Sequence, residues 1–428
     1  MERVQDHPDK GDIGVAASAG PLLSLIATGR AQSRAELIDR TGLSRTTVTQ
    51  RLNALIALGL VDEAAKTLPS GGRPTKMLQL NTGFGVILVA DIGESILRTA
   101  VTTLEPSILA ESTCTIELRG GPLPVLMQVA NQFRALLERI GRPPEDLLGA
   151  GLCLPAPVDF KAGRVFGPSI LTGWDDFDIR SWLGKELGAP VVVENDVNLM
   201  TLSESRRFWP EVEQLLYIKA GTGIGSGIIA DGRLYRGAQG AAGDIGHIQL
   251  NSDNPPLCRC GKLGCVEARA AGWALARDLR AKGFEAQNAR DIVALVQDNQ
   301  PEAIRCVREA GRVLGEVTAN VVSVLNPSLI VIGGTLSGAE DHLLAGVRQL
   351  VLERSLPLAT RELRIVRTKS DGSAGILGAA QLAIDTILHP DAIESVIVKH
   401  ARMAARQHHA AKGAASLQAA RPAQDDSR

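Results

Sequence analysis

The sequence lacks long apolar runs, an excess of charge of either sign and an even spread of cysteines. Its formal net charge is −1 over 428 residues, which excludes a protein that coats nucleic acid over its whole surface but allows a local basic module. No apolar run reaches the roughly 18 residues that a membrane-spanning helix needs, and the N-terminal MERVQDHPDKGDIG has no signal-peptide core. We therefore expect a cytoplasmic protein with no membrane partner.

The six cysteines argue against a disulfide framework. Three stand alone in the sequence, and the other three crowd into the stretch LCRCGKLGCVE, which follows a histidine in GDIGHIQL. One imidazole and three thiolates make a tetrahedral set that suits zinc. The expected Zn²⁺ ligands are His247, Cys258, Cys260 and Cys265. Because four protein ligands leave no position for water, the pattern indicates a structural site.

The composition is that of a soluble globular protein, with 45% apolar and 22% charged residues in a chain long enough for two or three domains. Changes of pattern along the chain predict four segments. These are a disordered lead-in over 1–18, a helical module with a hairpin over 19–81, an α/β body over 82–388, and an Ala- and Arg-rich tail over 389–428 that we expect to be disordered.

The segment 19–81 predicts a winged helix-turn-helix. Pro21 suits the first position of a helix, and helical patterns recur at 33–41 and 44–58 around a turn at Gly42. Two strand candidates, LVDEA and KMLQL, follow and are joined by the turn SGGRPT. This order of helices and hairpin indicates DNA binding by the second helix, in the major groove.

Charge agrees with DNA binding, because residues 30–80 contain eight basic and four acidic residues. The residues expected to contact DNA lie around the second helix and, for the last, at the tip of the wing: Arg34, Ser44, Arg45, Thr46, Thr49, Gln50, Arg51 and Arg73. The alternative is a three-helix bundle for protein contacts. Two modules related by symmetry would read an inverted-repeat operator, so we expect a homodimer or homotetramer.

The body alternates strands and helices, which predicts α/β architecture in two lobes. Buried strand candidates lie at 85–90, 148–153, 190–194, 214–219 and 328–332. Glycine-rich turns in DIGES, GTGIGSG and VIGGTLSG could present N–H groups to an anion, although such turns more often close a hairpin. Asn195 and Asp196 end the strand in VVVENDVNL, where they either bind a ligand or cap the next helix.

Taken in order, these motifs and three others resemble the ROK family of repressors, open reading frames and kinases, in the branch that joins a winged helix to a sugar kinase-type body. The other three are GLCLPAPVD, GAAGDIGH and NPSLIVIGG. The resemblance implies a two-lobed actin-like (ribonuclease H-like) fold that binds a sugar between the lobes. Its sugar contacts correspond to Asn195, Asp196, Asp244, His247 and Glu267.

Two substitutions bear on activity. Kinases of the family resemble D-x-G-G-T where this chain has DIGES, so Glu94 fills and charges a turn that would hold a phosphate. We interpret this as loss of ATP binding and expect no enzymatic activity; in a kinase, Asp196 would take the proton from the attacking hydroxyl. Asp244 is one methylene shorter than the family's Glu, which leaves the identity of the sugar open.

The leading hypothesis is a transcriptional regulator of carbohydrate genes, most often a repressor in this branch, whose operator binding responds to a sugar or sugar phosphate. One alternative is an ATP-dependent sugar kinase with a DNA-binding arm, which Asp196 and GTGIGSG favour and Glu94 opposes. Another is a constitutive DNA-binding or scaffold protein with a decayed cleft.

Overall fold

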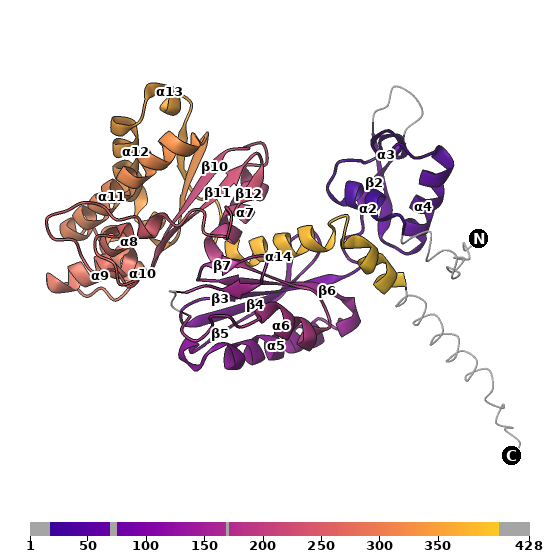
Figure 1. The fold of residues 1–428 in the computed structure, drawn as a ribbon, viewed down its shortest axis with the longest axis horizontal. Helices are drawn as coiled ribbons and strands as arrows, with labels where there is room; N and C mark the ends of the chain where they lie inside the picture. The colour runs from indigo at the N-terminus through magenta and orange to yellow at the C-terminus, as the bar shows by residue number, and fades with distance from the viewer. Residues whose placement is uncertain (1–17, 69–74, 168–170, 402–428) are drawn as a thin grey trace, which may run out of the picture.

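The computed structural model describes residues 18–68, 75–167 and 171–401, which form a small N-terminal module and two α/β lobes (Figure 1). The module stands at the end of the first lobe that is remote from the second lobe, and helix α14 runs across the first lobe between them. In the described part of the chain, no helix combines the length and the apolarity needed to cross a membrane.

The N-terminal module is three helices followed by a two-stranded sheet: α2 (Gly20–Ala27), α3 (Arg34–Thr41), α4 (Arg45–Ala57), β1 (Val61–Leu68) and β2 (Thr75–Leu80). Ser33 and Ser44 cap α3 and α4, each accepting a hydrogen bond from the N–H group three residues later. Gly42 ends α3 with φ at 67°, a left-handed conformation that glycine adopts without strain. The predicted helix-turn-helix is therefore present, with the hairpin behind it.

The first lobe is a mixed five-stranded sheet in the order β5-β4-β3-β6-β9. Its strands are β3 (Val86–Ile92), β4 (Ile96–Thr102), β5 (Ile108–Thr115), β6 (Leu147–Leu154) and β9 (Val191–Asn195). Strand β3 is apolar from Val86 to Ala90, and both of its faces are covered: Leu88 packs toward α5 (Pro122–Arg139) and α6 (Ile179–Leu187), and Val89 toward α14 (Ala374–Ile387). Shorter elements here are η1 (Leu118–Gly120), η2 (Pro144–Asp146), β7 (Val158–Asp159) and β8 (Arg164–Val165).

The second lobe repeats the same pattern in the order β12-β11-β10-β13-β14. Its strands are β10 (Leu215–Ala220), β11 (Ile224–Ala230), β12 (Arg233–Tyr235), β13 (Leu329–Gly333) and β14 (Arg364–Arg367). Its helices are η3 (Ile245–His247), α8 (Val266–Ala270), α9 (Gly272–Ala281), α10 (Ala289–Gln297), α11 (Pro301–Leu325), η4 (Thr335–Gly338), α12 (Glu340–Arg354) and α13 (Pro357–Thr360). An antiparallel meander followed by two parallel strands, occurring twice, confirms the predicted two-lobed actin-like fold.

Helix α7 (Asp196–Phe208) joins the lobes, because it packs against α14 of the first lobe and β11 of the second. A Cβ atom on Gly378 would lie 2.0 Å from the carbonyl oxygen of Leu199, so only glycine allows α14 to approach α7 this closely. The five strand candidates of the body all lie within one or two residues of observed strands. In contrast, only the first part of the GTGIGSG stretch is a turn, because β10 ends at Ala220 and β11 already begins at Ile224.

The C-terminal segment differs from the disordered tail that we expected over 389–428. Residues 393–401 are helical, and Ile393 and Ile397 are fully buried in the core that α14 shares with the N-terminal module. His400 Nε2 lies 2.9 Å from the Leu58 carbonyl oxygen, and Lys399 Nζ donates to the Leu147 carbonyl at 2.6 Å. This segment is ordered because it buries apolar side chains between the module and the first lobe; residues 402–428 lie outside the described residues.

Candidate functional site

Helix α4 presents a polar face near its N-terminus. Arg45, Thr46 and Gln50 are exposed, Thr49 and Arg51 are half-buried, and Val48, Leu52 and Leu55 are buried beneath them. This division lets the exposed side chains meet base edges or phosphates without disturbing the core. Ser44 is exposed but already caps α4, and Arg73 lies outside the described residues.

Arg34 is bound within the module instead of projecting freely from it. Its guanidinium pairs with Glu63 at 3.1 Å and donates to Asn53 Oδ1 at 3.3 Å, and Lys76 pairs with the same Glu63 at 2.9 Å. The hydrogen bonds from Lys76 and Arg34 lower the pKa of Glu63. Glu63 therefore fixes the wing to α3, and the sequence alone did not indicate that role.

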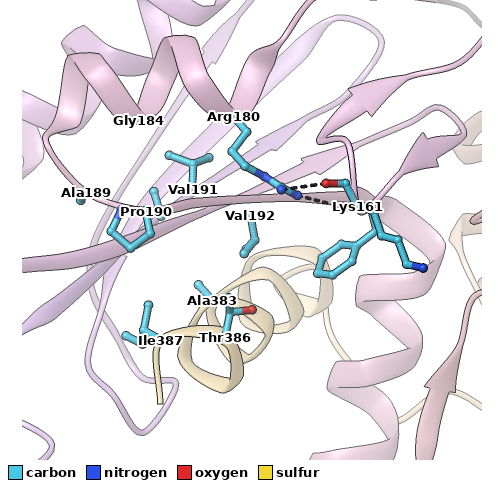
Figure 2. Close-up of a pocket in the computed structure, with 12 residues that line it drawn as sticks. Lys161, Arg180, Gly184, Ala189, Pro190, Val191, Val192, Ala383, Thr386 and Ile387 are labelled. Atoms are coloured by element: carbon cyan, nitrogen blue, oxygen red, sulfur yellow. Dashed lines mark hydrogen bonds between the residues drawn. The ribbon is translucent and has the colours of Figure 1, made fainter. Parts of the chain in front are cut away.

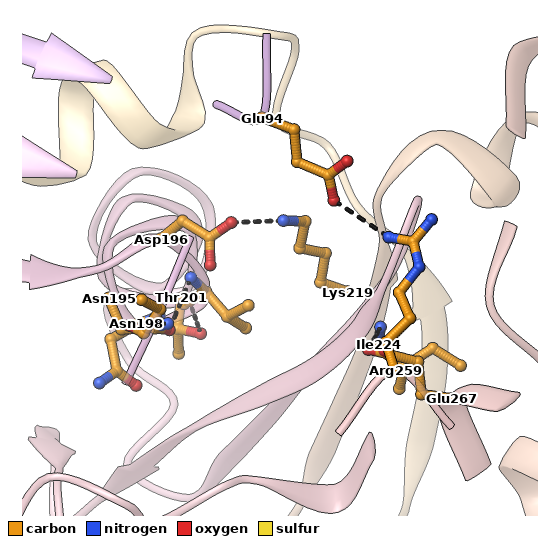
Figure 3. A network of polar contacts seen from close by, with 11 residues as sticks. Glu94, Asn195, Asp196, Asn198, Thr201, Lys219, Ile224, Arg259 and Glu267 are labelled. Carbon is orange, nitrogen blue, oxygen red and sulfur yellow. Dashed lines mark hydrogen bonds and ion pairs between the residues drawn. The ribbon is translucent and has the colours of Figure 1, made fainter. Parts of the chain in front are cut away.

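At the cleft, the strand ends bring together charged side chains from both lobes (Figure 3). Asp196 begins α7 directly after β9, and its carboxylate pairs with the ammonium of Lys219 at the end of β10. Burial alone would lower the pKa of Lys219, but Asp196 outweighs it and raises that pKa, so the ammonium stays charged. Burial and the nearby Asp196 raise the pKa of Asp91, at the end of β3.

Asn195 caps the N-terminus of α7, which was one of the two roles expected for the Asn-Asp pair. Its Oδ1 accepts from the N–H groups of Val197 at 3.0 Å and Asn198 at 3.3 Å, and its Nδ2 donates to the Ala156 carbonyl at 3.0 Å. One N–H of the amide is still free of these bonds, whereas the oxygen already accepts two. The carboxamide thus sets the start of α7 and with it the position of Asp196.

Glu94 points out of its turn toward the other lobe, where its carboxylate lies 3.5 Å from Arg259 (Figure 3). The turn itself is tight, with the Gly93 N–H bonded to the Ile96 carbonyl at 2.8 Å. Arg259 belongs to the cysteine-rich loop and also lies 4.9 Å above the Trp273 ring. The glutamate therefore links the first lobe to the cysteine-rich loop of the second lobe.

Glu267 lies against the second glycine-rich turn. Its Oε2 accepts the Ile224 N–H at 3.1 Å, and its Oε1 accepts from Trp273 Nε1 at 3.4 Å. A Cβ atom on Gly223 would lie 2.8 Å from Oε2, so the carboxylate lies directly beside this glycine. Asp244 is exposed and does not cap the short helix η3 that follows it.

Two buried glutamates that the sequence analysis missed hold the cleft elements in place. Glu194, with a side chain 1% exposed, pairs with Arg236 Nε at 2.6 Å and accepts from the Asn195 N–H at 2.9 Å and Asn198 Nδ2 at 3.0 Å. Glu204, fully buried, accepts bonds from the loop after β14, including the N–H groups of 369 and 370, both at 3.0 Å. The signal in the sequence was an acidic residue in each of the stretches ENDVN and SES, next to a strand and within a helix that are otherwise expected to be buried. A charge in such a place needs a partner.

The four predicted metal ligands form one cluster, with all their donor atoms within 4.8 Å of one another. His247 Nδ1 lies 3.7 Å from Cys258 Sγ, and the sulfurs of Cys260 and Cys265 are also 3.7 Å apart. A tetrahedral zinc with bonds of about 2.3 Å separates its sulfur ligands by about 3.8 Å. Burial and the neighbouring thiols raise the pKa of Cys265 to about 12. The residues fit a zinc ion, which would stabilise thiolates at these distances.

A cavity of about 350 Å³ lies outside the cleft, at the edge of the first lobe (Figure 2). Pro190 and Val191 of the β9 edge, Ile387 of α14 and the ring of Phe160 form its largely apolar wall. The Arg180 guanidinium donates to the Lys161 carbonyl at 2.9 Å and to that of Phe160. The residues predicted to bind sugar do not line this cavity.

The fold and the cleft define a two-lobed protein of the sugar-kinase type that carries a winged helix. The chain matches the ROK family model over residues 88–386 and a winged helix-turn-helix DNA-binding model over residues 22–62. The match covers well over half of the sequence, and the chain belongs to the ROK family.

Three relatives illustrate the similarity. A xylose repressor from Bacillus spizizenii is 28% identical over 371 residues, covering 86% of this chain and 94% of the repressor. A glucokinase from Halalkalibacterium halodurans is 30% identical over 310 residues, covering 68% of this chain and 93% of the glucokinase. A solved ROK family transcriptional regulator, a homolog of the E. coli MLC protein, has a TM-score of 0.75 at 26% identity, covering 90% of this chain and 99% of that chain.

Proposed function

We propose that the protein is a DNA-binding transcriptional repressor of sugar-utilisation genes, controlled by a sugar bound between the lobes. The observation that carries the proposal is the union of a winged helix-turn-helix with a ROK body in one chain. The similarity to the xylose repressor extends over more of the chain than the similarity to the glucokinase does. In this proposal, residues 19–81 bind DNA and 82–388 bind the effector.

The DNA contacts are assigned to the exposed face of α4 and its surroundings. Arg45, Thr46, Thr49 and Gln50 would read bases, and Arg51 and the wing residue Arg73 would contact the backbone or minor groove. Arg34 would position the wing through Glu63 and reach a phosphate only at the expense of that ion pair. A homodimer or homotetramer would place two modules on an inverted repeat.

The sugar contacts are assigned to Asp196, Asp244, His247 and Glu267, with Asn195 chiefly setting the position of Asp196. Carboxylates accept the hydroxyl protons of a sugar, and paired acceptors can meet two adjacent hydroxyls. With His247 Nδ1 facing Cys258, the other ring nitrogen is directed away from the metal cluster and suits a ligand contact. A structural zinc on His247, Cys258, Cys260 and Cys265 would hold this loop in place.

Kinase activity is disfavoured by two features of the cleft. Glu94 places a negative charge beside the turn that would face ATP, and the ion pair with Lys219 occupies the carboxylate of Asp196, which a kinase would need as its general base. The retained acids and the closed metal cluster instead support binding without phosphoryl transfer.

A continuous series of packed elements leads from the cleft to the DNA-binding module. Asp196 begins α7, α7 packs on α14, and α14 shares one core with residues 393–401 and with Leu22 and Leu55 of the module. Sugar binding that moves the lobes would therefore move α14 and the module together. The two placements of the modules would then differ in operator affinity.

The test is fluorescence anisotropy of the full-length protein on DNA from its own upstream region, at fixed salt, with and without sugars. We expect tight binding that one sugar shifts, and no ATP-dependent phosphorylation of that sugar in a coupled assay. Absence of sequence-specific DNA binding in every condition would refute the repressor function, and phosphorylation of the sugar would favour the kinase.

A further inference from the structure

Three groups of the cleft that could bind an anion are already bound by carboxylates of the protein itself. They are the ammonium of Lys219, the guanidinium of Arg259 and the backbone N–H of Ile224. The carboxylates belong to Asp196, Glu94 and Glu267, and Figure 3 shows all three pairs around one space. This pattern limits the charge of the effector.

The pair in the interior is the firmest of the three. The side chains of Lys219 and Asp196 are 27% and 15% exposed, and Asp91 and the thiol of Cys153 lie close enough to act on the Lys219 charge. Arg98, whose charge acts on Asp91, itself pairs with Glu111 at 3.3 Å. A phosphate placed here would face at least two carboxylates and would have to take Lys219 away from Asp196.

Three N–H groups in and beside the glycine-rich turn are already bound in a similar way. The Ile224 N–H points to Glu267 Oε2, the Ser226 N–H donates to the Gly243 carbonyl at 3.0 Å, and the Gly221 N–H donates to the Gly223 carbonyl at 3.0 Å. Glu267 thus occupies the position beside Gly223 that a phosphate oxygen would need. A carboxylate there is acceptor-only when ionised, so it attracts hydroxyl donors and repels anions.

At the mouth of the cleft, Glu94 and Arg259 are both nearly half exposed, so their attraction is weak and easily screened. Their juxtaposition still leaves Arg259 with a competing anion on one side and the Trp273 ring below. An incoming phosphate would therefore gain little from Arg259.

We propose that the effector is an uncharged, unphosphorylated sugar, and that Asp196, Glu267 and Glu94 exclude sugar phosphates by holding the donors that a phosphate would use. This inference rests on the proposed function of the cleft as an effector site. Hydroxyl groups can share these carboxylates, because each retains lone pairs beyond its bond to the protein. Lys219 Nζ can also donate one of its three protons to a sugar oxygen while it remains paired with Asp196.

The test compares D-xylose, D-glucose and N-acetyl-D-glucosamine with the phosphate esters of the same sugars, on the full-length protein. Thermal shift measures binding, and anisotropy on upstream DNA measures the response. We expect one uncharged sugar to act, and its phosphate ester to need a concentration about tenfold higher or more. The proposal is overturned if the ester acts at an equal or lower concentration, or if no uncharged sugar of the panel acts at millimolar concentration.

The two measurements separate this inference from the function on which it rests. Loss of DNA binding would contradict the repressor, whereas the thermal shift would still report which charge state of the sugar binds. Glu94→Gln should free Arg259 and reduce the discrimination against the ester by about threefold, as expected for a half-exposed ion pair. Glu362→Gln makes the same charge change on an 82% exposed surface residue and should leave the discrimination unchanged. If Glu94→Gln leaves unchanged the ratio of the concentrations at which the phosphate ester and the free sugar act, the electrostatic explanation of the discrimination is refuted.

Discussion

Replacing Arg236 with methionine should destabilise the protein more than most single substitutions, because it leaves the buried carboxylate of Glu194 without its cation. The Glu194 side chain is 1% exposed and Arg236 is 24% exposed, with 2.6 Å between the paired atoms. Removing one partner of a buried pair typically costs 3–5 kcal/mol. Since water can partly reach the position of Arg236, we expect about 3 kcal/mol, at the lower end of that range.

The double variant Glu194→Gln/Arg236→Met tests whether the unpaired charge of Glu194 causes the loss of stability. A neutral amide can keep accepting from the Asn195 N–H, and no charge remains buried, so the double variant should lose only about 1 kcal/mol. The difference of about 2 kcal/mol between the single and the double variant is the penalty for leaving the Glu194 charge unpaired. Tryptophan fluorescence during urea unfolding supplies the free energies.

The matched control is Arg361→Met, because Arg361 and Glu362 form an ion pair with side chains 71% and 82% exposed. It should cost no more than about 0.5 kcal/mol. If Arg236→Met costs less than about 1 kcal/mol, or if the double variant is as unstable as the single one, the charge is not buried as the structure indicates and the reasoning is wrong.

Four further predictions concern the cleft, the metal cluster and the C-terminal helix. Asp196→Ala should abolish the sugar response and leave operator affinity nearly unchanged in anisotropy; a persisting response would remove Asp196 from the effector site. Cys260→Ser, or a chelator, should release zinc detected by a colorimetric indicator and lower the Tm, and an unchanged Tm would argue against a structural metal. Ile397→Ala should cost about 2–5 kcal/mol in urea unfolding, because the side chain is fully buried, and a smaller loss would mean that the helix does not dock. Burial lowers the pKa of His400, so the unfolded chain binds a proton more readily and stability should fall as the pH drops below about 6.5. His400→Gln should flatten this dependence, and a wild-type stability that is flat between pH 7 and 5 would contradict it.

Local signals in the sequence were sufficient for most elements. Ser33 and Ser44 cap helices where their side chains can reach the N–H three residues on, and Gly42 ends a helix where only a left-handed residue fits. The apolar run over β3 indicated a strand buried on both faces. The cysteine spacing brought three thiols together by itself, because the segment 258–265 is short and glycine-rich.

Only the tertiary structure decided which charges meet. Lys219 and Asp196 are 23 positions apart, Arg236 and Glu194 42, and Arg259 and Glu94 165, and nothing local to either partner specifies the other. Likewise, a short helix such as 393–401 is marginal alone and forms because Ile393 and Ile397 are buried against the module. The sequence by itself determined most of the elements, the clustering of His247 with three cysteines, and the family. Packing over long sequence distances determined which charges meet between the lobes and how the C-terminal segment packs against the DNA-binding module.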